Sequence, residues 1–135
     1  MNARRTHSLE RLHYAARLAS ERGLSVQTDP AARFLSLHHE NSTVVLQFDP
    51  DSISLIVIEV DDDRRGQGIG SRLLNDVAWI ADQTEMPVRL FAMSMIYHEE
   101  PGLKQGALCA WYRRYGYEGD SVFLNRPPTA KCLAA

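Results

Sequence analysis

The segment RRGQGIGSRLL, residues 64–74, decides the fold expected for this chain of 135 residues. Two arginines precede three closely spaced glycines, and apolar residues at helical spacing follow. A strand that ends in a glycine-rich turn and continues as a helix often binds an anion, because the first N–H groups of a helix have no partner within it. The segment therefore predicts either a phosphate-binding loop or a flexible turn before a helix.

The glycines and arginines of this segment are suited to an anion. Gly66, Gly68 and Gly70 allow unusual dihedral angles and a close approach of the backbone to a phosphate. Arg64 or Arg65 could add a charge-assisted hydrogen bond. These features favour the phosphate-binding interpretation over a plain turn.

Two familiar phosphate loops do not fit the spacing. A P-loop needs Lys-Ser or Lys-Thr after its last glycine, and this chain has Ser71-Arg72 there. A dinucleotide-binding loop reads G-x-G-x-x-G, whereas residues 66–70 read G-x-G-x-G. The ligand class has to come from the surrounding sequence.

Periodicity around the loop predicts one mixed α/β (α+β) domain covering residues 1–135. We expect a central sheet of about six strands flanked by helices, with a parallel strand–helix–strand unit over residues 53–92. The first helix should start at Ser8 as its N-cap and stop at Gly23. The sequence locates five of these strands, at 33–38, 43–48, 53–60, 88–92 and 117–124, and the later helices follow residue 69 and span 103–115.

Two motifs resemble one family. Residues 65–70, RGQGIG, resemble the R/Q-x-x-G-x-G/A signature of the GCN5-related N-acetyltransferases (GNAT). About forty residues later, AWYRRYGY at 110–117 resembles the second signature of that family, and together the similarity covers about residues 53–120. It implies an acetyl-CoA-dependent N-acetyltransferase.

The resemblance also implies how the donor is held. The loop amides would bind the pyrophosphate of acetyl-CoA, and the end of the preceding strand would hydrogen-bond its pantetheine arm through the backbone. The implied donor-binding residues are Ile58, Val60, Arg65, Gly66, Gln67, Gly68, Ile69, Gly70 and Ser71.

Tyr112 falls on the position where many family members keep a tyrosine near the coenzyme sulfur. A phenol with a pKa near ~10 stays protonated at neutral pH and can donate its proton to a departing thiolate. The alternative is a core aromatic residue on an amphipathic helix.

The general base is less clear. Some relatives carry a glutamate on the central strand at the position of Ser54, which cannot serve as a base. Glu59 is our candidate, although strand alternation predicts that it faces away from Ser54, Ile56 and Ile58. His98, Glu99 and Glu100 form a second candidate cluster, and a relayed water or an already neutral amine would need no base.

Composition sets further expectations. The net charge of -2 gives no reason to expect nucleic acid or a membrane as partner, and the two cysteines lack metal-ligand spacing, so we expect no metal. The start of the chain does not read as a signal peptide, which favours a cytoplasmic protein. Shortened edge elements leave a homodimer open.

Two other functions remain open at the level of sequence. One is a non-catalytic acyl-CoA-binding sensor or complex subunit with the same fold. The other is a partner-binding domain in which the glycine loop is only a turn. An amine-bearing small molecule or a peptide is the expected acceptor if the chain is an enzyme, and nothing in the sequence chooses between them.

Overall fold

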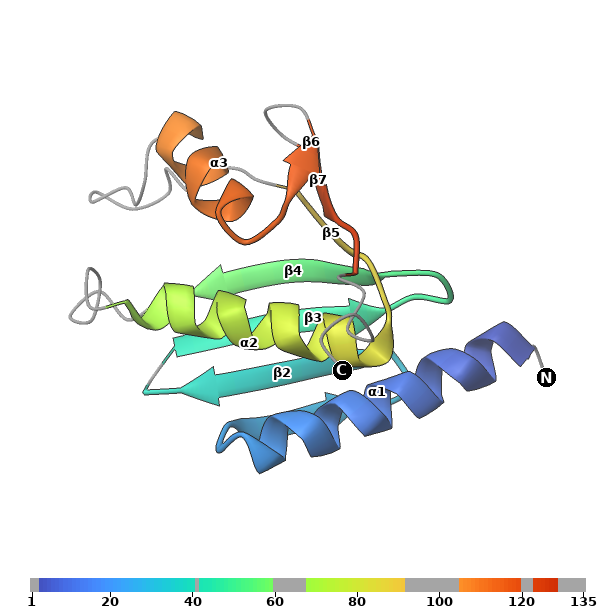
Figure 1. Cartoon of the computed structure of the whole chain (residues 1–135). Coiled ribbons are helices and arrows are strands. Elements are labelled where there is room, and N and C mark those ends of the chain that lie inside the picture. Colours follow the sequence, from blue (N-terminus) through green and yellow to red (C-terminus); the bar gives the residue numbers. More distant parts are fainter. Residues whose placement is uncertain (1–2, 41, 60–67, 92–104, 120–122, 129–135) are drawn as a thin grey trace, which may run out of the picture.

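The computed structural model describes residues 3–40, 42–59, 68–91, 105–119 and 123–128. Helices and strands alternate along these segments much as the sequence predicts (Figure 1). In chain order the elements are α1 (Ala3–Glu21), β1 (Ser25–Asp29), β2 (Phe34–His39), β3 (Ser42–Phe48), β4 (Ile53–Glu59), α2 (Ile69–Thr84), β5 (Val88–Phe91), α3 (Gln105–Arg113), β6 (Glu118–Gly119) and β7 (Phe123–Arg126).

The strands form one mixed sheet of seven, in the order β1-β2-β3-β4-β5-β7-β6. Strands β4 and β5 pair in parallel, with α2 as the crossover between them, and the other neighbouring pairs are antiparallel. The mixed α/β fold and the parallel strand–helix–strand unit are therefore confirmed.

Three local predictions need correction. The sequence indicated no strand at 25–29, where β1 forms the edge of the sheet. The single last strand expected at 117–124 is two strands, β6 and β7. Ser8 is not an N-cap, because α1 already begins at Ala3 and Ser8 lies inside it, fully buried. Gly23 does follow the helix, with a left-handed φ of 88°.

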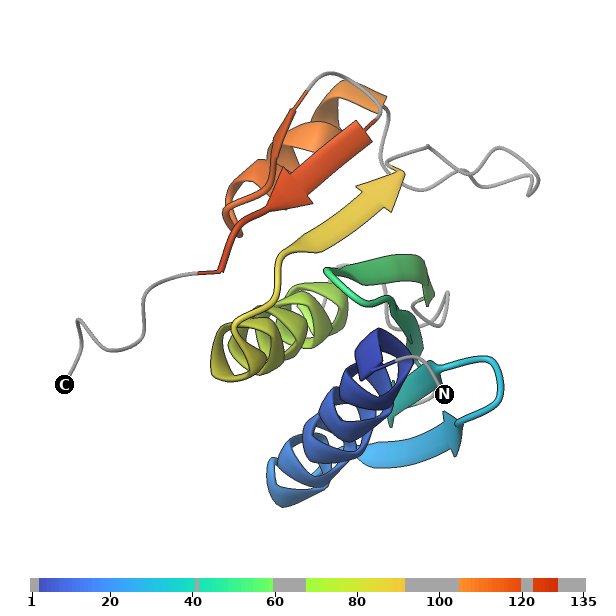
Figure 2. The ribbon, with the colours of Figure 1, turned by 90° about the vertical axis from the view of Figure 1, so that its right-hand side faces the viewer.

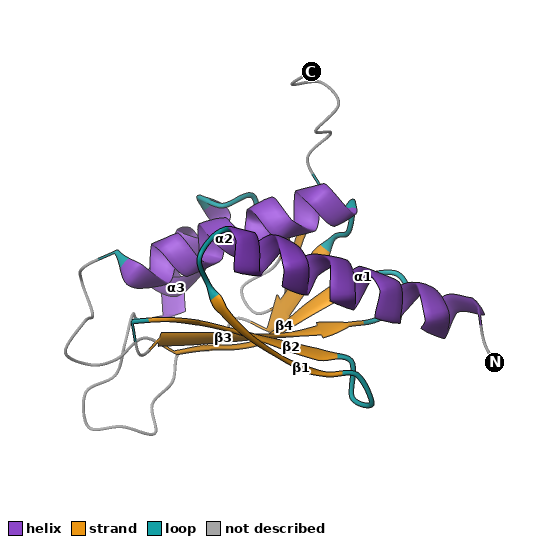
Figure 3. Ribbon diagram, turned by 90° about the horizontal axis from the view of Figure 1, so that it is seen from below, coloured by secondary structure: helices purple, strands orange, loops and turns teal. Residues whose placement is uncertain are grey.

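Helices α1 and α2 lie side by side on one face of the sheet, as Figures 2 and 3 show. Their apolar stripes are buried against alternate residues of the strands below, which makes one continuous core. Helix α3 contributes Cys109 and Tyr112 to the same core. Fully buried members include Leu12 and Ala19 of α1, Leu35, Val44, Leu46 and Ile53 of the strands, and Leu73, Val77 and Ile80 of α2.

A β-bulge interrupts the pairing of β3 with β4. Leu46 pairs with Leu55 and the next residue back, Val45, pairs with Val57, so Ile56 is the extra residue. Ile56 is 52% exposed although it is apolar and lies in the middle of an apolar strand. An extra residue reverses the alternation of side chains beyond it, and this changes which residues of β4 share a face.

Candidate functional site

The first turn of α2 begins at a glycine and leaves backbone N–H groups that a ligand could use. Gly68 is the N-cap residue in a left-handed conformation (φ 78°, ψ 8°), and it makes no side-chain cap because it has no side chain. The first backbone bond of the helix runs from the Arg72 N–H to the Gly68 carbonyl, over 2.9 Å. The preceding N–H groups of the helix, up to Ser71, thus lack helical partners and can bind a ligand.

The structure describes only part of the predicted loop. Gly70 is buried and Ser71 is half-buried in the first turn of α2, Gly68 is exposed, and Ile69 is the first residue of that helix. Four predicted donor-binding residues lie outside the described residues: Val60, Arg65, Gly66 and Gln67. The cluster His98, Glu99 and Glu100 also lies outside them.

Strands β4 and β5 separate near this helix start. Their described pairing runs from Ile53↔Val88 to Leu55↔Leu90, whereas β4 stays paired with β3 as far as Glu59↔Thr43. In Figure 1, β5 diverges from β4 as β4 runs toward the side of the sheet where α2 begins. The edge of β4 after Leu55 therefore carries backbone donors and acceptors that β5 does not use. Such an edge can bind an extended ligand through backbone hydrogen bonds.

Tyr112 lies in α3 and is only 5% exposed. Its ring contacts those of Trp111 and Tyr117, with centroid distances of 5.0 and 5.5 Å. Burial, and to a smaller extent the nearby Cys109 thiol, raise the pKa of Tyr112 to about 12. The phenol therefore stays protonated at neutral pH. Tyr112 is a core aromatic residue, as the alternative interpretation predicted, and its role as the acid stays a prediction.

A hydrogen bond joins the two sequence motifs. The Trp111 indole Nε1–H donates to the Ser71 hydroxyl oxygen over 2.8 Å, across 40 positions of sequence. Helix α3, which carries Tyr112, is thereby tied to the first turn of α2. This contact cannot be predicted from the sequence, since no spacing rule relates a tryptophan to a serine so far away.

Glu59 lies on the same face of the sheet as Ser54, whereas strand alternation predicted opposite faces for the two. Ser54 pairs with Gln47 and Glu59 with Thr43, and both positions of β3 alternate with the fully buried Val44 and Leu46. Ser54 and Glu59 therefore share the face turned away from the core, because the bulge reverses the alternation between them. The expectation that they oppose each other is wrong for this reason.

The other strand residue assigned to the donor, Ile58, faces the core. It pairs with the buried Val44 and packs against the core cluster, so it opposes Glu59 as expected. Its role in binding is therefore one for its backbone rather than its side chain.

A polar row crosses the sheet beside Glu59. Glu59 pairs with Thr43, Thr43 with His38, and His38 with Ser25. The His38 Nδ1 and the Thr43 hydroxyl oxygen are 2.9 Å apart, and the His38 Nε2 is buried without a hydrogen-bond partner in the described structure. Side chains at directly paired positions lie close together, so Glu59 has polar neighbours on the β3 side.

No group of three or more His, Cys, Asp or Glu residues within the described residues is arranged to hold a metal ion. None of the described helices is long and apolar enough to cross a membrane.

Comparison with known proteins gives a consistent result. Residues 30–119 match the family model described as an acetyltransferase (GNAT) domain. No curated protein sequence matches the chain. The match covers β2 to β6, which includes α2 and α3.

Similar solved structures come from several organisms and share the fold at low identity. The anti-CRISPR protein AcrVA5 has a TM-score of 0.56 and 21% identity, over 68% of this chain and 96% of that one. The ribosomal-protein-S18-alanine N-acetyltransferase from Escherichia coli has a TM-score of 0.57 and 17% identity, over 72% and 70%. A GNAT family acetyltransferase from Elizabethkingia anophelis with acetyl-CoA bound has a TM-score of 0.52 and 15% identity, over 70% and 74%.

Proposed function

The chain belongs to the acetyltransferase (GNAT) domain family, and we infer that this N-acetyltransferase moves the acetyl group of acetyl-CoA directly to an amine. The observation that carries the proposal is that the described residues of β5 leave the edge of β4 beyond Leu55 unpaired, next to the first turn of α2. A donor with a long amide-containing arm and a pyrophosphate needs these two features side by side.

The donor would lie with its pyrophosphate on the backbone amides at the start of α2. Gly68 lets the chain turn there without a Cβ, and the positive end of the helix dipole favours the negative charge. The pantetheine arm would pair with the backbone of β4 beyond Leu55, including that of Ile58. Of the similar structures, the one from Elizabethkingia anophelis holds acetyl-CoA, which supports this class of donor.

Loop residues that the structure does not describe complete this proposal. Arg65, Gly66, Gln67 and Val60 precede the described turn in sequence, and we assign them to the same pyrophosphate and pantetheine contacts as Gly68, Ile69, Gly70 and Ser71.

The reaction needs two proton transfers. The neutral amine attacks the thioester carbonyl, a C–N bond forms, and the C–S bond breaks with its electron pair leaving on sulfur. Tyr112 donates its proton to the departing thiolate, and Glu59 accepts the proton lost by the amine, directly or through a water molecule. Tyr112 lies on the core side of the sheet and Glu59 on the other side, so the opening between β4 and β5 would have to join them.

Two substitutions of one glycine test the donor site. Asn and Asp both adopt left-handed backbone more readily than other side chains, and a Cβ at position 68 meets no atom within 4 Å. Gly68→Asn and Gly68→Asp therefore differ chiefly in one negative charge at the predicted phosphate site. By calorimetry we expect Gly68→Asp to weaken coenzyme A binding at least tenfold more than Gly68→Asn.

The outcomes separate the possible functions. Wild-type protein that fails to bind coenzyme A at millimolar concentration would refute the donor site. Binding without thiol release from acetyl-CoA, across amino acids, polyamines, aminoglycosides and peptides, would instead support an acyl-CoA sensor. Thiol release with one of these amines identifies the acceptor class.

A further inference from the structure

Within the described residues the Trp111 side chain makes one hydrogen bond, and that bond reaches the predicted phosphate site. Its Nε1–H donates to the Ser71 hydroxyl oxygen over 2.8 Å. Its ring is half-buried, 5.0 Å from the Tyr112 ring and 6.4 Å from the Tyr115 ring, in an edge-on contact with the latter. Trp111 thus lies between the residue that would donate the proton and the residue that would bind the phosphate.

The direction of this hydrogen bond determines what Ser71 can do. An indole N–H can only donate, so the serine oxygen must be the acceptor. The hydroxyl keeps its own proton, and no described residue accepts that proton. Side chains of a helix lean toward its N-terminus, so the Ser71 hydroxyl is near the free amides of the first turn.

We propose that Trp111 is a positioning residue for the donor phosphate. By occupying the Ser71 oxygen it directs the Ser71 proton to a phosphate oxygen of acetyl-CoA. The same bond holds α3, and with it Tyr112, in register with the phosphate-binding turn of α2. This inference rests on the proposed function, since it assigns a role within the same site.

A purely structural Trp111 would behave differently. Loss of ring packing would lower stability and would affect every donor alike, because packing does not depend on phosphate. Loss of the Nε1–H alone, with an aromatic ring kept in place, should affect only donors that carry phosphate. The comparison therefore needs two donors and one conservative variant.

Trp111→Phe and Ser71→Ala remove the two sides of the bond, and Ser71→Thr keeps a hydroxyl. With acetyl-CoA and any amine found to release thiol, we expect KM for the donor to rise about tenfold in Trp111→Phe and more in Ser71→Ala. With S-acetylpantetheine, which lacks the pyrophosphate, KM should stay within twofold. Ser71→Thr should restore most of the acetyl-CoA affinity, and Tyr115→Phe, in the turn that follows α3, should match wild type.

Non-additivity tests whether the two residues act as one unit. The double variant Trp111→Phe/Ser71→Ala should lose no more affinity than Ser71→Ala alone, because the indole then has no oxygen to orient. Thermal unfolding of each variant checks folding, and Ser71→Ala, the smaller change, carries the test if Trp111→Phe does not fold.

Two results would overturn the inference while leaving the proposed function intact. One is an equal rise of KM for acetyl-CoA and S-acetylpantetheine in Trp111→Phe, and the other is no change for either donor. Failure of the wild-type protein to bind coenzyme A would be a different result, since it would refute the proposed function itself.

Discussion

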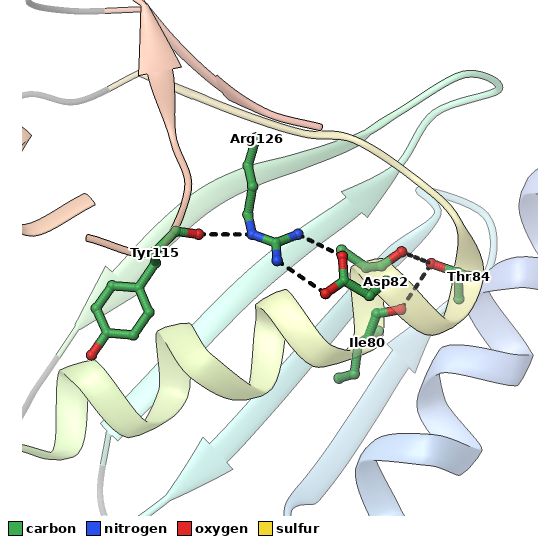
Figure 4. Close-up of polar contacts among 6 residues, drawn as sticks. Ile80, Asp82, Thr84, Tyr115 and Arg126 are labelled. Carbon is green, nitrogen blue, oxygen red and sulfur yellow. Dashed lines mark hydrogen bonds and ion pairs between the residues drawn. The ribbon is translucent and has the colours of Figure 1, made fainter. Parts of the chain in front are cut away.

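Arg126 of β7 and Asp82 of α2 form a two-pronged ion pair, with Nη1–Oδ1 at 2.8 Å and Nη2–Oδ2 at 3.0 Å (Figure 4). The Arg126 Nε–H also donates to the Tyr115 carbonyl oxygen over 2.8 Å, in the turn that follows α3. One side chain thus connects three elements around the last strands of the sheet. The Arg126 and Asp82 side chains are 8% and 19% exposed, so water screens the pair little.

We therefore expect Asp82→Asn to destabilise the protein strongly. The variant removes the negative charge that faces the buried Arg126 guanidinium, and breaking a buried ion pair in this way typically costs about 3 kcal/mol or more. The free energy of unfolding from urea titration measures the effect. Asn125→Ala, at an exposed position of the same strand, is the matched control and should change stability by less than about 0.5 kcal/mol. Equal stability of Asp82→Asn and wild type would show that the pair contributes nothing.

The sequence predicted those elements whose side chains are sorted between core and solvent. Helix α2 and strands β2, β3 and β5 bury apolar residues at regular spacing, and β4 is apolar over most of its length. The predicted limits of these elements lie within a few residues of the observed ones. Strand β1 was missed because it is an edge strand in which Val26 is the only apolar residue, and the other four are exposed. Backbone hydrogen bonds to β2 hold β1 in place, and such bonds require no particular side chains that a sequence pattern could show.

The site was predicted less completely, for two physical reasons. The bulge at Ile56 places Glu59 on the same face of the sheet as Ser54. The bulge cannot be recognised in the sequence, because one extra apolar residue in an apolar strand looks like part of the strand. The contact of Trp111 with Ser71 depends on the packing of two helices, which periodicity within each helix does not fix. The sequence therefore predicts which residue types lie near the site, but not which side chains contact one another there.

Glu59→Gln tests the assignment of the base. The amide keeps the shape of the side chain but cannot accept a proton, so we expect kcat to fall about 100-fold near neutral pH. The loss should shrink at alkaline pH, where more of the acceptor amine is already neutral. Steady-state rates across pH measure both effects.

The control for the base is Glu118→Gln, which removes an exposed carboxylate from β6. It should leave kcat unchanged. A Glu59→Gln enzyme with the wild-type rate at every pH would rule out this base and favour a relayed water or an amine that binds neutral.

Tyr112→Phe tests the acid and has a separate signature in stability. The pKa of Tyr112 is about 12 in the folded protein, against 10.0 for an unperturbed tyrosine, mainly because the side chain is buried. The phenol therefore stays protonated through the usual assay range, so kcat of the wild type should show no alkaline loss from this group below about pH 10. Tyr112→Phe should lower kcat at every pH while leaving KM for the donor within a few-fold.

The stability signature follows from the raised pKa. Below pH 10 the Tyr112 phenol is protonated in both the folded and the unfolded chain, whereas between pH 10 and 12 it is protonated only in the folded chain. The free energy of unfolding therefore falls as pH rises through this range. The contribution of this residue is up to about 1.4 kcal/mol per pH unit. Burial also raises the pKa of Tyr117, so Tyr112→Phe should reduce the slope without abolishing it. Urea unfolding at several values between pH 9 and 11.5 measures it. A slope unchanged by Tyr112→Phe would mean that the buried phenol does not hold its proton more tightly than an exposed one.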